Sequence, residues 1–484
     1  MENFIKYLEQ EHDILLIKGS HHSCQAVDVA VVNTGDGDFL VVQGTGEKDF
    51  YGAKRRFSGH PLLTCELSVA NAQALMHYFP YLKPSSIPEQ SLSFGFGDRL
   101  GRATLGHLKA VMQFEVFPVL AQQSMRELSL TNRTYDDVLS SAVFDVLKAG
   151  YMDGFAADGD HLKTIPQIEL AIDAGFNMIT LDCSEHIHNQ ATDYSESELE
   201  AHFSALASET KDHYLANYLN REIPSLGIID KVELFRTVLT FHEAIMHAIQ
   251  CYKFIMSRDR KIHFELSMDE TPHTTSPIAH FIIVNELLKN DVNLFSFAPR
   301  FHGQFEKGID YIGHIDTFAR TFEQHQQIVN HFDSYKLSVH SGSDKFSVMP
   351  IIGKIAGGSF HIKTAGTSWL EAVRLVAIKD PNLYRKMHEI ALSRIDKARM
   401  YYNVSLDMER IPPIKLMNDA YLPNYMNLPD ARQALHITYG LILETESVHR
   451  AFFELLDHEI TFYSELLKAH LSQHMRFLGA HSRT

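Results

Sequence analysis

Cysteine is scarce in this chain of 484 residues. The four cysteines are far apart and form no Cys-x-x-Cys pair: Cys24, Cys65, Cys183 and Cys251. This spacing excludes a disulfide framework and favours reduced thiols in a cytoplasmic protein.

Long apolar runs are also missing. No run of about 18 apolar residues occurs, which is the length that a membrane-spanning helix needs. The first residues, MENFIKYLEQEHD, are polar and lack the apolar core of a signal peptide. The sequence therefore predicts neither a membrane span nor a secreted product.

Basic clusters are few. The chain has 44 Lys and Arg against 60 Asp and Glu, a formal net charge of -16, and no basic run longer than Lys54–Arg56. Binding to a phosphate backbone needs a basic surface, so we expect no nucleic-acid partner. The hydrophobic content of 45% is ordinary for a globular enzyme, and a homo-oligomer is left open.

Eight short apolar runs, most of them followed by a helix-period stretch, occupy the middle of the chain. They cover residues 92–97, 115–120, 154–157, 177–183, 262–267, 293–298, 336–340 and 359–363. Strands that alternate with helices in this way predict an α/β fold, a (β/α)8 TIM-type barrel over residues 91–380.

Three further segments flank or interrupt the predicted barrel. Residues 1–90 are β-rich, with short apolar runs between Gly and Asp turns. Residues 186–258, after the fourth strand, have the pattern of amphipathic helices, and we expect this insertion over the mouth of the barrel. Residues 381–484 are predicted to be helical, apart from a Pro-containing stretch at 411–429.

Histidines follow three of the predicted strands, at His161, His302 and His340. The carboxyl ends of barrel strands converge on one face, so these imidazoles should line a single pocket. A single histidine at a strand end is more often structural, but three of them favour a divalent-metal site. Zn, Mn, Co and Ni all accept imidazole with oxygen ligands.

Two carboxylates occupy similar places. Asp160, in FAADGDHLKT, precedes His161, and a carboxylate beside a metal-bound imidazole is a familiar arrangement for proton transfer. The alternative is an Asp/Gly turn that caps the next helix. Glu265, in HFELSMDET, lies on the inward face of its predicted strand, where the alternative is a structural ion pair.

Candidate substrate-binding residues follow the later strands: Arg300, Gln304, Asp344 and Lys363. Lys363 is expected to bind an anionic group of the substrate, because the last strands of such barrels often supply that site. Arg300 is a second candidate for that group, from its charge and position. The alternative for Lys363 is again a structural ion pair.

Several long motifs, in order, resemble the tagaturonate epimerase family: FGFGDRLGRATLGH, GFAADGDHLKT, TLDCSEHI, HFELSMDETPHTTSP, FAPRFHGQFEKGIDY, LSVHSGSDKFSVMP and FHIKTAGTSWLEA. The resemblance implies a metal-dependent sugar epimerase that interconverts D-tagaturonate and D-fructuronate. It implies His161, His302 and His340 as metal ligands and Asp160 and Glu265 as the acid/base pair. Some relatives act on D-tagatose and D-fructose, so the expected partner is a keto-sugar acid or a ketohexose.

Tagaturonate and fructuronate differ at C4 when the ketone is counted as C2. Simple enolisation inverts C3, and oxidation at C4 needs a nicotinamide, for which the sequence has no convincing fingerprint. A retro-aldol route is therefore favoured. Two rival functions are a metal-dependent hydrolase, whose usual His-x-His after the first strand is missing, and a sugar-binding protein without activity.

Overall fold

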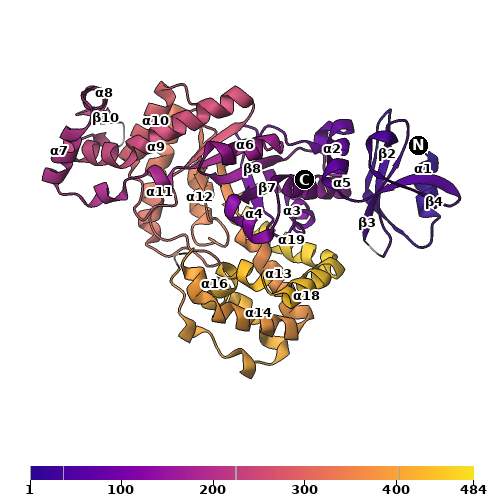
Figure 1. Cartoon of the computed structure of the whole chain (residues 1–484). Coiled ribbons are helices and arrows are strands. Elements are labelled where there is room, and N and C mark those ends of the chain that lie inside the picture. The colour runs from indigo at the N-terminus through magenta and orange to yellow at the C-terminus, as the bar shows by residue number, and fades with distance from the viewer. Residues whose placement is uncertain (1, 36, 224–225, 403, 484) are drawn as a thin grey trace.

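The computed structural model describes residues 2–35, 37–223, 226–402 and 404–483. A closed barrel of eight parallel strands lies at its centre (Figure 1). Around the barrel the strands are β6 (Ser93–Gly97), β7 (Phe117–Ser124), β8 (Ala156–Leu162), β9 (Met178–Asp182), β12 (His263–Ser267), β13 (Ser296–Ala298), β14 (Lys336–Val339) and β15 (Phe360–Thr364). The predicted fold class, a TIM-type α/β barrel, is confirmed.

Helices follow the strands and surround the barrel. They are α3 (Thr104–Val111), α4 (Met125–Thr131), α5 (Tyr135–Ala149), α6 (Ile165–Asp173), α10 (Pro277–Lys289), α11 (Ile315–Phe332), α12 (Met349–Ala356) and α13 (Gly366–Lys379). Local sequence sets their limits: α5 begins at a capping box between Thr134 and Asp137 and ends at Gly150, whose φ of 63° is left-handed.

The third barrel strand is longer than predicted. We expected it to end at Ala157, but β8 continues to Leu162 and therefore contains both Asp160 and His161. The polar Asp/Gly sequence is typical of a turn, yet the neighbouring strands β7 and β9 supply backbone partners along it. The pairing with β9 is irregular between Gly159 and Leu162, and His161 there has a φ of 53°.

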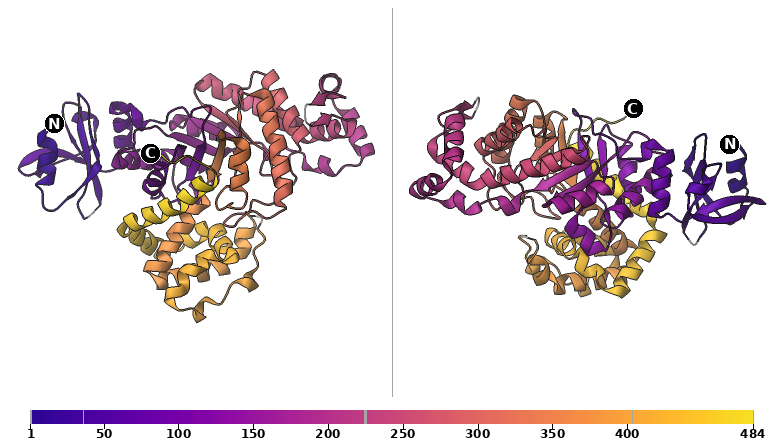
Figure 2. Two further views of the ribbon diagram at one scale, coloured as in Figure 1. Left: turned by 180° about the vertical axis from the view of Figure 1, so that it is seen from behind. Right: turned by 45° about the horizontal axis from the view of Figure 1, so that its top comes forward.

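The N-terminal region is an antiparallel sheet in the order β1-β2-β3-β5-β4 at one end of the molecule (Figures 1 and 2). Its elements are α1 (Glu2–Glu9), β1 (Leu15–Ser23), β2 (Asp28–Asn33), β3 (Asp38–Gln43), η1 (Glu47–Asp49), β4 (Gly52–Phe57), β5 (His60–Cys65), α2 (Val69–Tyr78) and η2 (Pro80–Leu82), where η is a 3-10 helix. An ion pair of 2.9 Å between Asp38 and Lys148 joins the sheet to α5.

The insertion between β9 and β12 is helical, as expected. It contains η3 (Ser184–His186), η4 (Asn189–Asp193), α7 (Glu196–Ala205), α8 (Ser208–Tyr218), β10 (Glu222–Ile223), β11 (Gly227–Ile228) and α9 (Lys231–Arg258). Helix α9 packs against α6 and α10 on the outside of the barrel, and α7 and α8 project from that side (Figure 1). Helix α9 thus covers the outer helices. The expected position of the insertion over the mouth stays a prediction; Asp193 of η4 lies 3.9 Å from His273 in the loop after β12.

The C-terminal region is helical and packs beside the barrel (Figure 2). It comprises α14 (Pro381–Ser393), α15 (Ile395–Arg399), η5 (Met408–Arg410), η6 (Ile414–Leu416), η7 (Asp419–Asn427), α16 (Pro429–Ile437), α17 (Tyr439–Leu443), α18 (Glu446–His458) and α19 (Ile460–Phe477). Helix α19 returns to pack on α3 and α13. The domain boundaries at residues 90 and 380 stay a prediction; both fall between elements.

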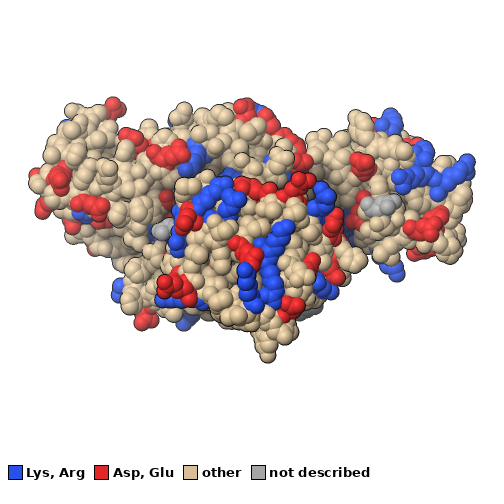
Figure 3. Space-filling model, turned by 60° about the horizontal axis from the view of Figure 1, so that its bottom comes forward, with Lys and Arg blue, Asp and Glu red and all other residues tan. Residues whose placement is uncertain are grey.

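Acidic and basic side chains are mixed on the face of the molecule shown in Figure 3. This distribution is ordinary for a protein surface with a modest excess of acidic residues. Within the described ranges, every helix is too short or too polar to cross a lipid bilayer.

Candidate active site

A pocket opens at the carboxyl ends of the barrel strands. Strand β7 contributes Ser124, β8 contributes Asp160 and His161, and β15 contributes Lys363. Loops after the strands, the first residues of α4 and α13, and one residue of α16, His436, complete its wall. The described part of the insertion, residues 186–223 and 226–258, contributes no residue to this lining, whereas the C-terminal region contributes His436.

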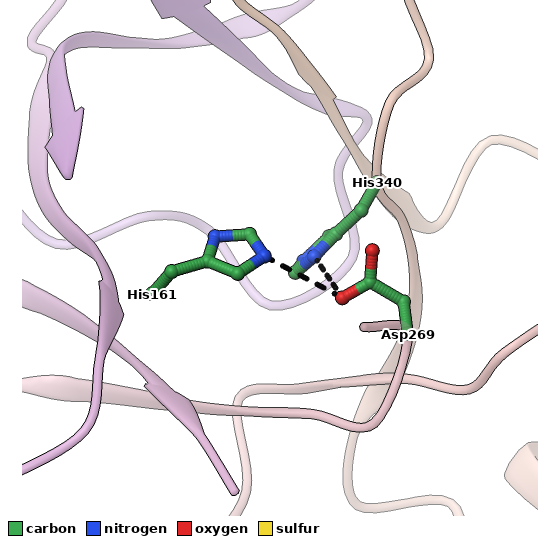
Figure 4. Close-up of side chains that lie close together, drawn as sticks. All are labelled: His161, Asp269 and His340. Atoms are coloured by element: carbon green, nitrogen blue, oxygen red, sulfur yellow. Dashed lines mark hydrogen bonds and ion pairs between the residues drawn. The ribbon is translucent and has the colours of Figure 1, made fainter. Parts of the chain in front are cut away.

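Two of the three predicted histidines meet in this pocket. Figure 4 shows His161 and His340 pointing toward the carboxylate of Asp269. The Nδ1 atom of His340 lies 2.9 Å from Asp269 Oδ1, and the Nε2 atom of His161 lies 3.5 Å from the same oxygen. His161, Asp269 and His340 each offer one possible ligand atom, and these three atoms all lie within 4.8 Å of one another. Two imidazoles and a carboxylate are a known ligand set of catalytic divalent metals.

A carboxylate holds the opposite nitrogen of each imidazole. His161 Nδ1 lies 2.7 Å from Asp160 Oδ1, and His340 Nε2 lies 2.8 Å from Glu265 Oε1. A metal-bound histidine typically donates its other N–H to a carboxylate, which sets the ring's orientation and tautomer. Asp160 and Glu265 therefore leave His161 Nε2 and His340 Nδ1 to face Asp269.

Lys363 joins three carboxylates at the wall of the pocket. Its Nζ atom lies 2.6 Å from Asp158, 2.8 Å from Asp160 and 2.9 Å from Glu265. It also contacts the hydroxyl of Thr180. The ammonium group is thus surrounded by carboxylates, which is the structural alternative considered for Lys363; its role in substrate binding stays a prediction.

Glu265 is wholly buried, with an exposed fraction of 0%. Besides His340 and Lys363 it accepts hydrogen bonds from Ser296 (2.5 Å) and Thr180 (3.1 Å). The sheet register explains these contacts, because Thr180, Glu265 and Ser296 lie level with one another on β9, β12 and β13. Glu265 is not among the pocket's lining residues, whereas Asp160 is.

The charges of this cluster shift its proton equilibria. Burial raises the pKa of Asp160 and Glu265, but Lys363 and the neighbouring histidines outweigh burial and hold both pKa values well below the usual range. Burial lowers the pKa of His161, yet the adjacent Asp160 raises it well above 6.5. Burial raises the pKa of Asp158 to about 6 against the opposing effect of Lys363.

His302 lies apart from these groups. It is half-buried in the loop after β13 and does not belong to the set formed by His161, Asp269 and His340. In the same loop Arg300 Nη2 donates to Gln304 Oε1 at 2.9 Å, and neither residue lines the pocket. The loop supplies Lys307 to the pocket instead. The roles of His302, Arg300 and Gln304 stay predictions.

Asp344 belongs to a second buried cluster. Its carboxylate lies 2.7 Å from Arg432 and 2.6 Å from His470 Nε2, and its backbone N–H donates to His474 Nε2 at 2.9 Å. Asp344, His470 and His474 have atoms close enough for a metal ion. However, the His474 nitrogen already accepts a hydrogen bond, and Arg432 supplies the positive charge. The cluster therefore ties α16 and α19 to the loop after β14. Asp344 is absent from the pocket lining, and its role in substrate binding stays a prediction.

Asp269 is the residue that sequence reasoning missed. It lies two residues beyond the end of β12, in the HFELSMDET motif where only Glu265 was selected. A carboxylate two residues beyond the end of a barrel strand could have been selected as a candidate ligand from the sequence alone. The left-handed φ values of His161 (53°) and Ser341 (52°) are a further sign of function, because such strain collects at active sites.

The barrel and its polar pocket define an enzyme that binds a small polar substrate, with a ligand set suited to a divalent cation. The family model for tagaturonate epimerase matches residues 18–478. This chain belongs to the tagaturonate epimerase family and is an isomerase-class enzyme. The hydrolase and binding-protein alternatives are thereby set aside.

Individual relatives agree with this assignment. The tagaturonate/fructuronate epimerase of Thermotoga maritima is 36% identical over 448 residues, 92% of each chain. Crystal structures of the fructuronate-tagaturonate epimerase UxaE from Cohnella laeviribosi are 40% identical and cover 99% of both chains. Their TM-scores are 0.95 for a glycerol complex and 0.94 for the native form.

Proposed function

We propose that this enzyme interconverts D-tagaturonate and D-fructuronate by epimerisation at C4 and that it requires a divalent metal ion. The observation that carries the proposal is the set His161, Asp269 and His340 at the carboxyl end of the barrel. The other nitrogen of each histidine is held by a carboxylate, which is the second layer expected around a metal site. His302 remains a candidate ligand from the loop after β13.

The metal is Zn, Mn, Co or Ni, each of which accepts imidazole and carboxylate ligands. Bound at this site, a divalent cation supplies Lewis-acid stabilisation of negative charge on the ketone side of the substrate. The donor set, two imidazole nitrogens and one carboxylate oxygen, fits such an ion.

The chemistry follows from the position of the inverted carbon. The hydrogen on C4 is not acidic, because C4 is β to the ketone at C2. Retro-aldol cleavage of the C3–C4 bond releases the proton of the C4 hydroxyl and leaves an enediolate over C1–C3 and an aldehyde over C4–C6. Rotation of the aldehyde and re-formation of the bond from its other face invert C4, and the proton returns to the new alkoxide.

Asp160 is the residue that we assign to this proton transfer. Its Oδ1 atom contacts His161 and Lys363, and these contacts leave Oδ2 available to the pocket. Glu265 was expected to share the role, which stays a prediction; its side chain is wholly buried and is absent from the pocket lining. We infer that Glu265 acts as a positioning residue, which orients His340 and balances the charge of Lys363.

Neutral ketohexoses carry the same ketone and C4 hydroxyl, so D-tagatose and D-fructose are proposed as additional, weaker substrates. Proton NMR of the enzyme with D-tagaturonate tests the whole proposal. We expect fructuronate to form with added metal, to stop forming after EDTA treatment, and to form again when metal is restored. Turnover that is unchanged after complete metal removal would refute the metal requirement, and no turnover with any of the four metals would refute the reaction.

A further inference from the structure

The pocket is rich in positively charged side chains. Five of its lining residues are Lys or Arg: Arg99, Arg126, Lys307, Lys345 and Lys363. Uncompensated charge is unfavourable where water is excluded, so each of these cations except the exposed Arg126 needs a partner in the protein or a ligand. The partners in the structure differ, and the difference indicates where an anionic substrate group binds.

Two of the five cations have a full set of partners within the protein. Lys363 lies among three carboxylates. Lys345 donates to the carbonyl oxygens of Glu306 (2.8 Å), Ile309 (2.6 Å) and Ser343 (2.9 Å). In this structure the ammonium groups of both side chains are therefore fully paired within the protein.

Arg99 is only partly satisfied. Its Nε atom donates to Glu127 Oε1 at 2.7 Å, and its guanidinium lies over the ring of Tyr439. Its Nη1 atom is buried, and among the described residues it has no hydrogen-bond partner. Arg99 is 3% exposed, so an unused donor there is costly unless a ligand accepts its hydrogen bond.

Lys307 and Arg126 have no carboxylate partner. Within the described ranges, no Asp or Glu oxygen lies within the 4.0 Å of an ion pair from either side chain. Lys307 Nζ donates to Ser341 Oγ at 2.8 Å, and the Arg126 guanidinium lies 5.1 Å from the centre of the Tyr402 ring. Burial and the positive charge of Arg126 lower the pKa of Lys307, while the carboxylates of Glu270 and Asp269 oppose this shift.

We propose that Lys307 and Arg126, together with the free Nη1 of Arg99, bind the carboxylate group of the uronate. This inference rests on the proposed function and adds the residues that select an acid over a neutral sugar. Lys307 is joined to Ser341, the residue after His340, so the carboxylate subsite adjoins the group of His161, Asp269 and His340. The substrate would then bridge the two, with its ketone at one end and its carboxylate at the other.

Steady-state kinetics of Lys307→Met and Arg126→Met provide the test, with Lys109→Met as the matched control. Lys109 forms an exposed ion pair with Glu465 away from the pocket. Loss of one charged hydrogen bond should raise KM for D-tagaturonate by about tenfold or more. KM for D-tagatose should change little, and the control should match the unmodified enzyme. Arg126 is exposed, so its variant is expected to fold normally.

Inhibition by a fragment gives a second readout. Glycerate resembles the C4–C6 fragment with its aldehyde reduced, and glycerol is the neutral counterpart. Glycerate should inhibit the unmodified enzyme more strongly than glycerol, and both variants should lose that preference. If the unmodified enzyme does not convert tagaturonate, the proposed function fails. If it does, but both variants keep the normal KM and the preference for glycerate, only the carboxylate subsite is refuted.

Discussion

Replacement of Lys363 by methionine should strongly destabilise the barrel. Lys363 Nζ contacts three carboxylates at 2.6, 2.8 and 2.9 Å, and the side chains of Lys363, Asp158 and Glu265 are 4%, 0% and 0% exposed. Removing one partner of a buried ion pair costs about 3–5 kcal/mol. A typical domain has an unfolding free energy of about 5–15 kcal/mol, so this loss should be plain in denaturant unfolding at pH 7.

The loss should depend on pH in a defined direction. Asp160 and Glu265 have pKa values well below their ordinary 3.8 and 4.5, where burial is outweighed by Lys363 and the histidines. Groups with a lowered pKa stabilise the fold above their unfolded pKa, and this stability is lost as the pH falls. Without Lys363 the carboxylates bind protons more readily. The difference in unfolding free energy between the unmodified protein and Lys363→Met should therefore become smaller as the pH falls through about 4.5.

Lys345→Met is the matched control. Lys345 is as deeply buried as Lys363, but its Nζ atom is held by carbonyl oxygens instead of carboxylates. Its removal should lower the unfolding free energy by an amount that stays the same as the pH falls into the acid range. Both variants should be compared with the unmodified protein after EDTA treatment, so that bound metal does not contribute. The reasoning would be refuted if Lys363→Met lost less than about 1 kcal/mol of unfolding free energy at pH 7. It would also be refuted if the difference from the unmodified protein stayed constant down to pH 4.

Three further predictions test the site and its support. Asp269→Asn should reduce bound metal, measured by mass spectrometry after dialysis, and activity should fall with it; a full metal complement would contradict the ligand assignment. Glu265→Gln should lower metal affinity about 10- to 100-fold, as expected of a residue that orients a ligand, and added metal should restore part of the activity. A dead enzyme with unchanged metal affinity would instead support direct catalysis by Glu265. Asp344→Asn should speed amide hydrogen exchange in α19, since it weakens the contacts with Arg432 and His470; unchanged exchange would contradict that role.

The barrel could be predicted because each strand carries its own local signal. All eight predicted runs overlap barrel strands, as buried apolar segments followed by amphipathic helices should. The errors fall where tertiary pairing overrode local pattern. The Asp/Gly sequence after Ala157 is typical of a turn, but two neighbouring strands hold it in β8. Strand β4, with the sequence GAKRRF, has little apolar character of its own, and its pairing with β5 is what makes it a strand.

The site was predicted in part for a related reason. Convergence of strand ends indicates which residues approach one another, and it brought His161 and His340 together as expected. It does not indicate how far a loop carries a side chain beyond its strand. His302 lies four residues past the end of β13, and its loop brings Lys307 to the pocket instead. Asp269 follows its strand more closely and reaches both histidines.

By itself the sequence determined the α/β barrel, the family and the histidines at the strand ends, because hydrophobic period and motif order are local properties of the chain. Only the tertiary structure decided which atoms meet. Asp269 between His161 and His340, Lys363 among three carboxylates, and His436 in the pocket wall each depend on residues that are distant along the chain. Their partners are chosen by the closure of the barrel and the packing of α16 against it, since burial penalises any charge left without a partner.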